Sequence, residues 1–137
     1  MSKSCDNHEE GGKMKLPVKV KKLLGKNKLI VFGTSSKKGE PNNIVVASCG
    51  IYNNDILIAD CQMKKTLKNL RENSNVSLCV MDKKNYFQIK GKTQYFTKGN
   101  WFNIVEKMLT GTPYQPKGAV VIKIKEGYDL NKCKKII

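Results

Sequence analysis

Six segments of this chain have the composition of β-strands, and most of them are joined by short turns. Aliphatic residues alternate with polar ones along several segments, as Val76, Leu78 and Val80 do, and a period of two is typical of strands with one buried face. The expected strands cover residues 28–35, 42–49, 55–61, 76–81, 86–96 and 120–125. No strand–helix–strand rhythm runs through the chain, so the pattern predicts a mainly β fold, a six-stranded antiparallel barrel of Greek-key type.

Three short helices are expected around these strands. Apolar residues recur at helical spacing from Leu16 to Leu24, ahead of Gly25, which predicts an amphipathic helix that closes one end of the barrel. A second helix is expected over residues 64–72, directly after a strand, and a third between Gly99 and Gly111.

The length of 137 residues fits one folded domain. Residues 1–13 are polar and are expected to form a flexible tail, which leaves residues 14–137 as the single domain. The chain has no run of about 20 apolar residues, and its N-terminus lacks the apolar core of a secretion signal. We therefore expect a soluble, cytoplasmic protein with no membrane partner.

The five cysteines lack the paired spacing of a zinc site or of a disulfide framework, and three of them lie in strand-like segments. Buried free thiols in a reducing compartment explain this usage. Cys5 and His8, followed by Glu9 and Glu10, have the donor types of a metal clip. Since zinc sites usually have four ligands, a polar tail is the favoured interpretation, and the metal alternative stays open.

The formal charge of +15 suggests a nucleic-acid partner, because clustered cations release counterions from a phosphate backbone. However, Arg71 is the only arginine among the 26 basic residues, and the lysines are scattered along the whole chain. Base-reading proteins rely on the bidentate fork of arginine, and single-strand binders add exposed aromatic residues. Nucleic-acid binding is therefore disfavoured, and a basic barrel that binds single strands is kept as an alternative function.

One junction carries a specific chemical signal. The expected strand that ends near Asp60 leads directly into a short helix, and such a junction presents free backbone N–H groups and the positive end of the helix dipole. Lys64 and Lys65 add positive charge there, and the Thr66 hydroxyl adds a donor. The junction therefore predicts a site for a phosphate dianion.

The sequence offers few residues for other kinds of active site. The only histidine is His8, in the expected tail, so no histidine of the domain is available to a nucleophile pair or as a haem ligand. Asp60 beside the strand end is interpreted as a helix cap rather than as a catalytic acid. Flavin chemistry needs no such constellation, because the ring transfers the electrons itself.

Four motifs occur together in a recognisable order: the turn from Gly39 to Asn42, Met63 to Thr66 followed by Asn69, Phe87 to Gly91, and Lys117 to Val120. With them, the chain resembles the pyridoxamine 5'-phosphate oxidase-like, FMN-binding split-barrel superfamily over nearly all residues from 16 to 130. It is most similar to the short members, such as the small FMN-binding proteins of anaerobes.

This resemblance implies non-covalent FMN as the cofactor and assigns a set of binding residues. Lys64, Lys65 and Thr66 would hold the FMN phosphate, with Asn69 one turn further along. The second strand would lie beside the isoalloxazine ring, and the pocket-lining strand would add two candidates. The other residues so assigned are Asn42, Asn43, Ile44, Val45, Gln88 and Lys90. Lys117 and the loop before it would come from a second subunit, because the family binds flavin at a homodimer interface.

The chain also departs from the vitamin B6 oxidases of that superfamily. Those enzymes carry an arginine and a lysine on the second strand and a long C-terminal segment for the substrate phosphate, whereas residues 43–48 here contain no basic residue. The sequence therefore predicts an FMN-dependent oxidoreductase or electron carrier with an unknown redox partner, and not a true pyridoxamine phosphate oxidase. A deazaflavin-dependent reductase is a further alternative.

Overall fold

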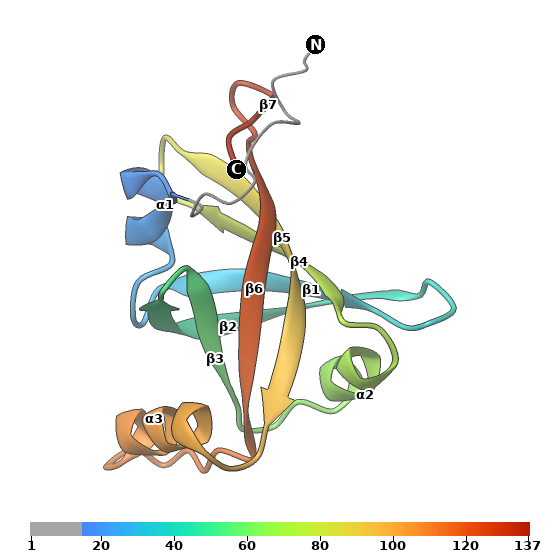
Figure 1. Ribbon diagram of the computed structural model, residues 1–137, viewed down its shortest axis with the longest axis vertical. Helices are drawn as coiled ribbons and strands as arrows, with labels where there is room; N and C mark the ends of the chain where they lie inside the picture. The colour runs from blue at the N-terminus through green and yellow to red at the C-terminus, as the bar shows by residue number, and fades with distance from the viewer. Residues whose placement is uncertain (1–14) are drawn as a thin grey trace.

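The computed structural model describes residues 15–137, and the expected tail and its Cys5–His8 pair lie outside this range. The strands are β1 (Leu29–Ser35), β2 (Pro41–Tyr52), β3 (Asp55–Asp60), β4 (Asn75–Met81), β5 (Tyr86–Phe96), β6 (Gly118–Asp129) and β7 (Lys134–Lys135). The helices are α1 (Val18–Leu23), α2 (Lys65–Glu72) and α3 (Asn100–Leu109). Figure 1 shows α2 and α3 towards one end of the barrel and α1 and β7 towards the other.

The first six strands form a closed antiparallel barrel. Their order is β3-β2-β1-β4-β5-β6, and pairing between β3 and β6 closes the sheet. Because β4 returns to lie beside β1 after the β1–β2–β3 meander, the topology is a Greek key. The predicted fold class is thus confirmed, and every predicted strand corresponds to an observed one.

Two features of the sheet differ from the prediction. β2 runs on to Tyr52 rather than ending at Cys49, and an irregularity between Ser48 and Ile51 bends it there. A bulge breaks the alternation of buried and exposed residues, so the period of two ends before the strand does. β7 was not predicted, because two exposed lysines carry no strand pattern.

The core fills the barrel with alternate residues of each strand, such as Ile30, Phe32 and Leu78, all at most 1% exposed. The helix predicted between Leu16 and Leu24 packs onto this core. Helix α3 covers the outer face of β3 and β6 instead. There its fully buried Val105 contributes to a second cluster with Trp101 and Met108.

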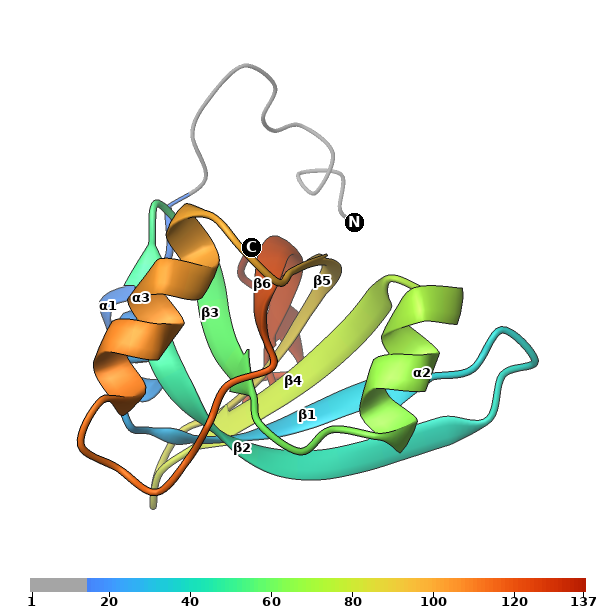
Figure 2. The same cartoon turned by 90° about the horizontal axis from the view of Figure 1, so that it is seen from below.

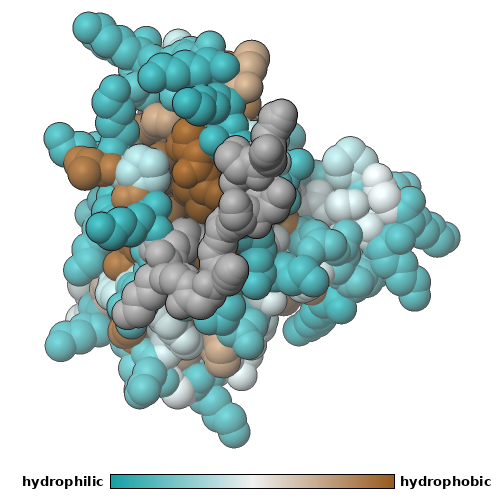
Figure 3. All heavy atoms as spheres, turned by 45° about the horizontal axis from the view of Figure 1, so that its top comes forward, coloured by the Kyte–Doolittle hydropathy of each residue, from teal (hydrophilic) through white to brown (hydrophobic). Residues whose placement is uncertain are grey.

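All lysines of residues 15–137 are exposed, and they are spread over every part of the molecule. Hydrophilic side chains cover most of the face shown in Figure 3, where the hydrophobic ones gather in a patch near its upper centre. No helix in this part of the chain is both long and apolar enough to span a membrane.

Candidate functional site

A cavity of about 730 Å³ lies between β2, the link from β3 to α2, and the end of α3 with the loop after it. Figure 2 looks at this end of the barrel and shows that link and that loop passing between the two helices. Of the eleven residues assigned to FMN from the sequence, the cavity brings together Asn42, Ile44, Val45, Lys64, Lys65 and Thr66. Its volume is within the range of pockets that hold small molecules or cofactors.

One end of the cavity, which we call the anion end, gathers groups that could hold an anion. Helix α2 begins at Lys65, and its first internal hydrogen bond is donated by the Lys68 N–H to the Lys64 carbonyl at 3.0 Å. The N–H groups before Lys68 are therefore not used by the helix. The Thr66 side chain is buried, and its hydroxyl accepts a hydrogen bond from Asn42 Nδ2 at 3.2 Å, while Lys64 and Lys65 are exposed. Charge, a hydroxyl and free N–H groups thus meet at one place.

Asp60 organises the link that leads to this end. Its carboxylate is fully buried: Oδ1 accepts the Met63 N–H at 2.8 Å, and Oδ2 accepts the Tyr95 hydroxyl at 2.5 Å. The helix-cap interpretation of Asp60 is wrong, because the residue before α2 is Lys64 and the carboxylate caps the preceding turn instead. Burial and the hydrogen bond to Asp60 raise the pKa of Tyr95 well above its usual range, so this tyrosine stays protonated as a donor.

Much of the remaining wall of the cavity is apolar or carries thiols, and Asn27, Ser48, Gln62 and Thr112 add polar groups. Val45 and Ala47 of β2, Ala59 of β3 and Met108 of α3 face it, with the thiols of Cys49 and Cys61. Burial raises the pKa of Cys49; burial and then the Asp60 carboxylate raise that of Cys61. Both thiols are therefore neutral near pH 7. Among residues 15–137, no carboxylate and no histidine lines the cavity.

Asn69 lies on the face of α2 that packs against β1, and not in the cavity. It is 1% exposed, and its Nδ2 donates to Thr34 Oγ1 of β1 at 3.0 Å, which fixes the helix against the sheet. Its Oδ1 is buried without a partner in the described part of the chain. Asn69 thus supports the position of Thr66 one turn earlier and does not line the cavity.

Three other assigned residues lie on the outer surface of the sheet, beyond the lining of the cavity. Asn43 of β2 is paired with Gly33 of β1, while Gln88 and Lys90 of β5 are paired with β4. Lys90 Nζ lies 5.7 Å from the centre of the Tyr128 ring. None of the three lines the cavity of its own chain.

Lys117 is tied to its own chain. Its N–H donates to the Asp60 carbonyl at 2.6 Å, and its ammonium donates to the Met63 carbonyl at 3.1 Å. The loop before it lines the cavity of the same chain through Thr112 and Tyr114. The assignment of Lys117 to the flavin of a second subunit stays a prediction.

Sequence reasoning missed Cys49, Cys61 and Met108 as lining residues. The cysteines were interpreted as buried free thiols, and no binding role was assigned to Met108. An apolar strand residue can point into the barrel core, or it can point outward and be covered by the end of a helix. The sequence pattern is the same in the two cases. Only the position of α3 distinguishes the two.

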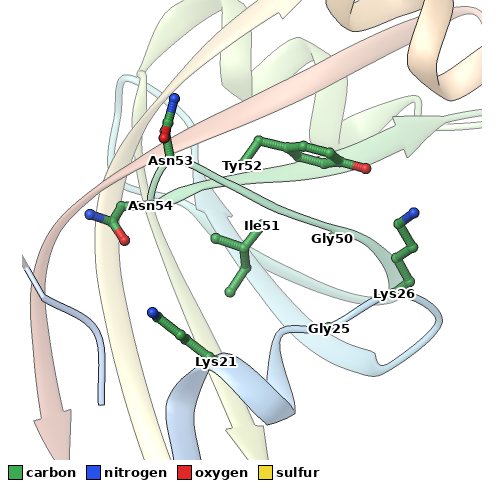
Figure 4. A pocket seen from close by; sticks show the side chains of 8 residues that line it. All are labelled: Lys21, Gly25, Lys26, Gly50, Ile51, Tyr52, Asn53 and Asn54. Carbon is green, nitrogen blue, oxygen red and sulfur yellow. The ribbon is translucent and has the colours of Figure 1, made fainter. Parts of the chain in front are cut away.

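A second cavity, of about 570 Å³, lies between the β2–β3 turn and the end of α1 with the segment after it (Figure 4). It is lined by Lys21 and Lys26 near α1, and by Tyr52, Asn53 and Asn54 at the turn. Its polar rim contains none of the residues assigned from the sequence.

The sequence profile of the pyridoxamine 5'-phosphate oxidase family matches residues 16–131. The chain belongs to this family. An uncharacterised protein of Methanocaldococcus jannaschii is 37% identical over 110 residues, which are 76% of this chain and 74% of that protein.

Solved structures share the fold at low identity. HupZ of Group A Streptococcus has a TM-score of 0.79 at 18% identity, over 89% of this chain and all of that chain. An FMN-binding protein of Syntrophomonas wolfei has a TM-score of 0.66 at 20% identity, over 74% of this chain and 76% of that one. An F420 reductase has a TM-score of 0.64 at 14% identity, over 82% and 98%.

Proposed function

We propose that the chain is a flavoprotein that binds FMN non-covalently in the 730 Å³ cavity and serves as an oxidoreductase or an electron carrier. The observation that carries the proposal is the anion end of this cavity. Thr66, buried and fixed by Asn42, lies with Lys64 and Lys65 at the start of α2. A phosphate dianion fits this donor set, because helix N-termini and lysines bind phosphate by charge-assisted hydrogen bonds.

The other walls fit an isoalloxazine ring. Val45 and Ala47 of β2 present an apolar surface, and Met108 of α3 faces it across the cavity. FMN would supply the redox chemistry, and the protein would position it and exclude water.

The experiment that tests this function is identification of the released cofactor. The purified protein is denatured, and the supernatant is analysed by absorbance spectrum and mass. FMN supports the proposal. A deazaflavin would point to the reductase alternative, which the F420 reductase fold and the lysines at the anion end also favour. A colourless protein that binds neither FMN nor the deazaflavin F420 on titration contradicts both.

We further propose that the protein is a homodimer with the flavin at its interface. The outer face of β1, β2 and β4 exposes Leu29 (70%), Val45 (64%) and Met81 (51%), and the strand registers place them on one side of the sheet. Exposed apolar side chains on one face of a sheet are candidates for burial in an interface. Gln88 and Lys90 lie beside this patch on β5. In a dimer formed through this face, these two residues of one subunit would approach the flavin beside Val45 of the other.

Light scattering is expected to give twice the monomer mass of 15.4 kDa at micromolar concentration. The change Leu29→Glu should shift the protein to the monomer, because it places a charge in the apolar interface. Val18→Glu, at an equally exposed position on α1, is the control and should leave the dimer intact. A wild-type monomer with flavin bound would contradict the proposal.

Thiol labelling provides a second test of the cavity. Maleimide should label Cys61 about tenfold more slowly when free FMN exceeds Kd by about ten times, because the bound ligand covers the thiol. Cys133, which is exposed at the far end of the barrel, should react at an unchanged rate. The labelled peptides are quantified by mass spectrometry. Equal rates at Cys61 with and without FMN would place the flavin elsewhere.

A further inference from the structure

Met63, the residue directly before Lys64, is held at both of its backbone polar groups. Its N–H donates to Asp60 Oδ1 at 2.8 Å, and its carbonyl accepts the Lys117 ammonium at 3.1 Å. Its side chain, 7% exposed, packs in the barrel core. The link from β3 to α2 is therefore fixed one residue ahead of the anion end.

All of these restraints converge on Asp60. Its second carboxylate oxygen accepts the Tyr95 hydroxyl from β5, its backbone carbonyl accepts the Lys117 N–H from the start of β6, and the Lys117 ammonium lies 3.9 Å from Oδ1. One fully buried carboxylate thus connects β3, β5 and β6 to the link.

The negative charge of Asp60 is unfavourable for phosphate binding at the nearby anion end. A buried carboxylate close to a phosphate site repels the dianion and costs desolvation energy. The Lys117 ammonium offsets part of this cost. The geometry of the carboxylate explains why this position has an aspartate: its two oxygens accept hydrogen bonds from Met63 and from Tyr95 at the same time.

We propose that Asp60 is a positioning residue for the anion end of the cavity. By holding Met63 it sets the direction in which α2 starts, and so aims the first N–H groups of the helix and the Thr66 hydroxyl at the ligand phosphate. This inference rests on the proposed function, since it assigns Asp60 to phosphorylated flavin. It predicts an effect on FMN that riboflavin, which has no phosphate, does not share.

The test compares FMN and riboflavin affinities by flavin fluorescence titration of the purified full chain. Asp60→Ala should weaken FMN binding by about ten- to a hundredfold and riboflavin binding by less than about threefold, as expected when phosphate donors are misdirected. Asp60→Asn should stay within about threefold of the wild type for both ligands, because its amide oxygen still accepts the Met63 N–H. Asp55→Ala is the matched control: it removes a carboxylate of the same strand that pairs with Lys123 on the surface.

Tyr95→Phe is the second variant in case Asp60→Ala does not fold. It removes only the hydroxyl that holds Oδ2, and should weaken FMN binding by about threefold with riboflavin unchanged. Equal losses for FMN and riboflavin would indicate a merely structural role and overturn the proposal. An Asp60→Asn variant as weak as Asp60→Ala would also overturn it, since charge rather than position would then act.

A wild-type chain that binds no flavin would refute the proposed function but not yet this inference. Inorganic phosphate then serves as the probe, with the amide NMR signals of Lys65 and Thr66 as the readout. Shifts that Asp60→Asn keeps and Asp60→Ala loses support the positioning role. Shifts that Asp60→Ala keeps, or the absence of any shift in the wild type, overturn it.

Discussion

Replacing both Lys64 and Lys65 by alanine is expected to weaken FMN binding by about two to three orders of magnitude, since each lost charge-assisted hydrogen bond costs about 1 to 3 kcal/mol. Both side chains lie at the anion end of the cavity, beside the buried Thr66 hydroxyl. Lys65→Ala alone should cost about 1 to 3 kcal/mol. Flavin fluorescence titration measures the affinities. Riboflavin should bind both variants nearly as well as it binds the wild type.

The control is the double change Lys19→Ala with Lys22→Ala. Both side chains are exposed on α1, and their removal lowers the formal charge of +15 by the same two units. If the electrostatic field of the whole protein attracted FMN, the two double variants would lose FMN affinity equally. This loss would be larger at low salt. A loss confined to the Lys64–Lys65 variant assigns the phosphate to the start of α2.

The barrel was predictable because its strands obey a simple rule. Residues such as Ile30 and Phe32 alternate with exposed neighbours, so sequence spacing alone identifies the buried face. The meeting of Lys64, Lys65 and Thr66 at the start of α2 was predictable for a similar reason, because strand, basic pair and helix start follow one another within a few residues. Local sequence is sufficient where neighbours in the chain are also neighbours in space.

The rest of the site depends on long-range pairing that local sequence does not contain. Tyr95 reaches Asp60 across 35 residues, and Lys117 reaches Met63 across 54. Nothing near Asp60 in the sequence indicates these partners, so its carboxylate looked like a helix cap. The assignments of Gln88 and Lys90 to the flavin depend on a second copy of the chain, and they stay predictions.

Replacing Gly91 by alanine is expected to lower the free energy of unfolding by about 3 kcal/mol or more, the upper range for overpacking a core. Gly91 lies at the register shift between β5 and β6, where the two strands approach closely. A Cβ there would lie 2.4 Å from the Lys123 carbonyl oxygen and 3.1 Å from Ile122 Cγ2. The nearest obstacle is backbone, which cannot move aside as a side chain does, so the β5–β6 pairing itself must shift. Urea unfolding of the flavin-free protein measures the change without a contribution from ligand binding.

Gly39→Ala separates this steric cost from the general cost of replacing a glycine. Gly39 has a φ of +91° at the β1–β2 turn, and a Cβ there would meet nothing within 4 Å. Its replacement should cost only about 1 kcal/mol, through the strained backbone conformation alone. Equal losses in the free energy of unfolding would contradict the prediction. They would mean that the β5–β6 pair has room to accommodate a Cβ at Gly91. A much larger loss at Gly91 shows that the closed barrel depends on a glycine at this register shift.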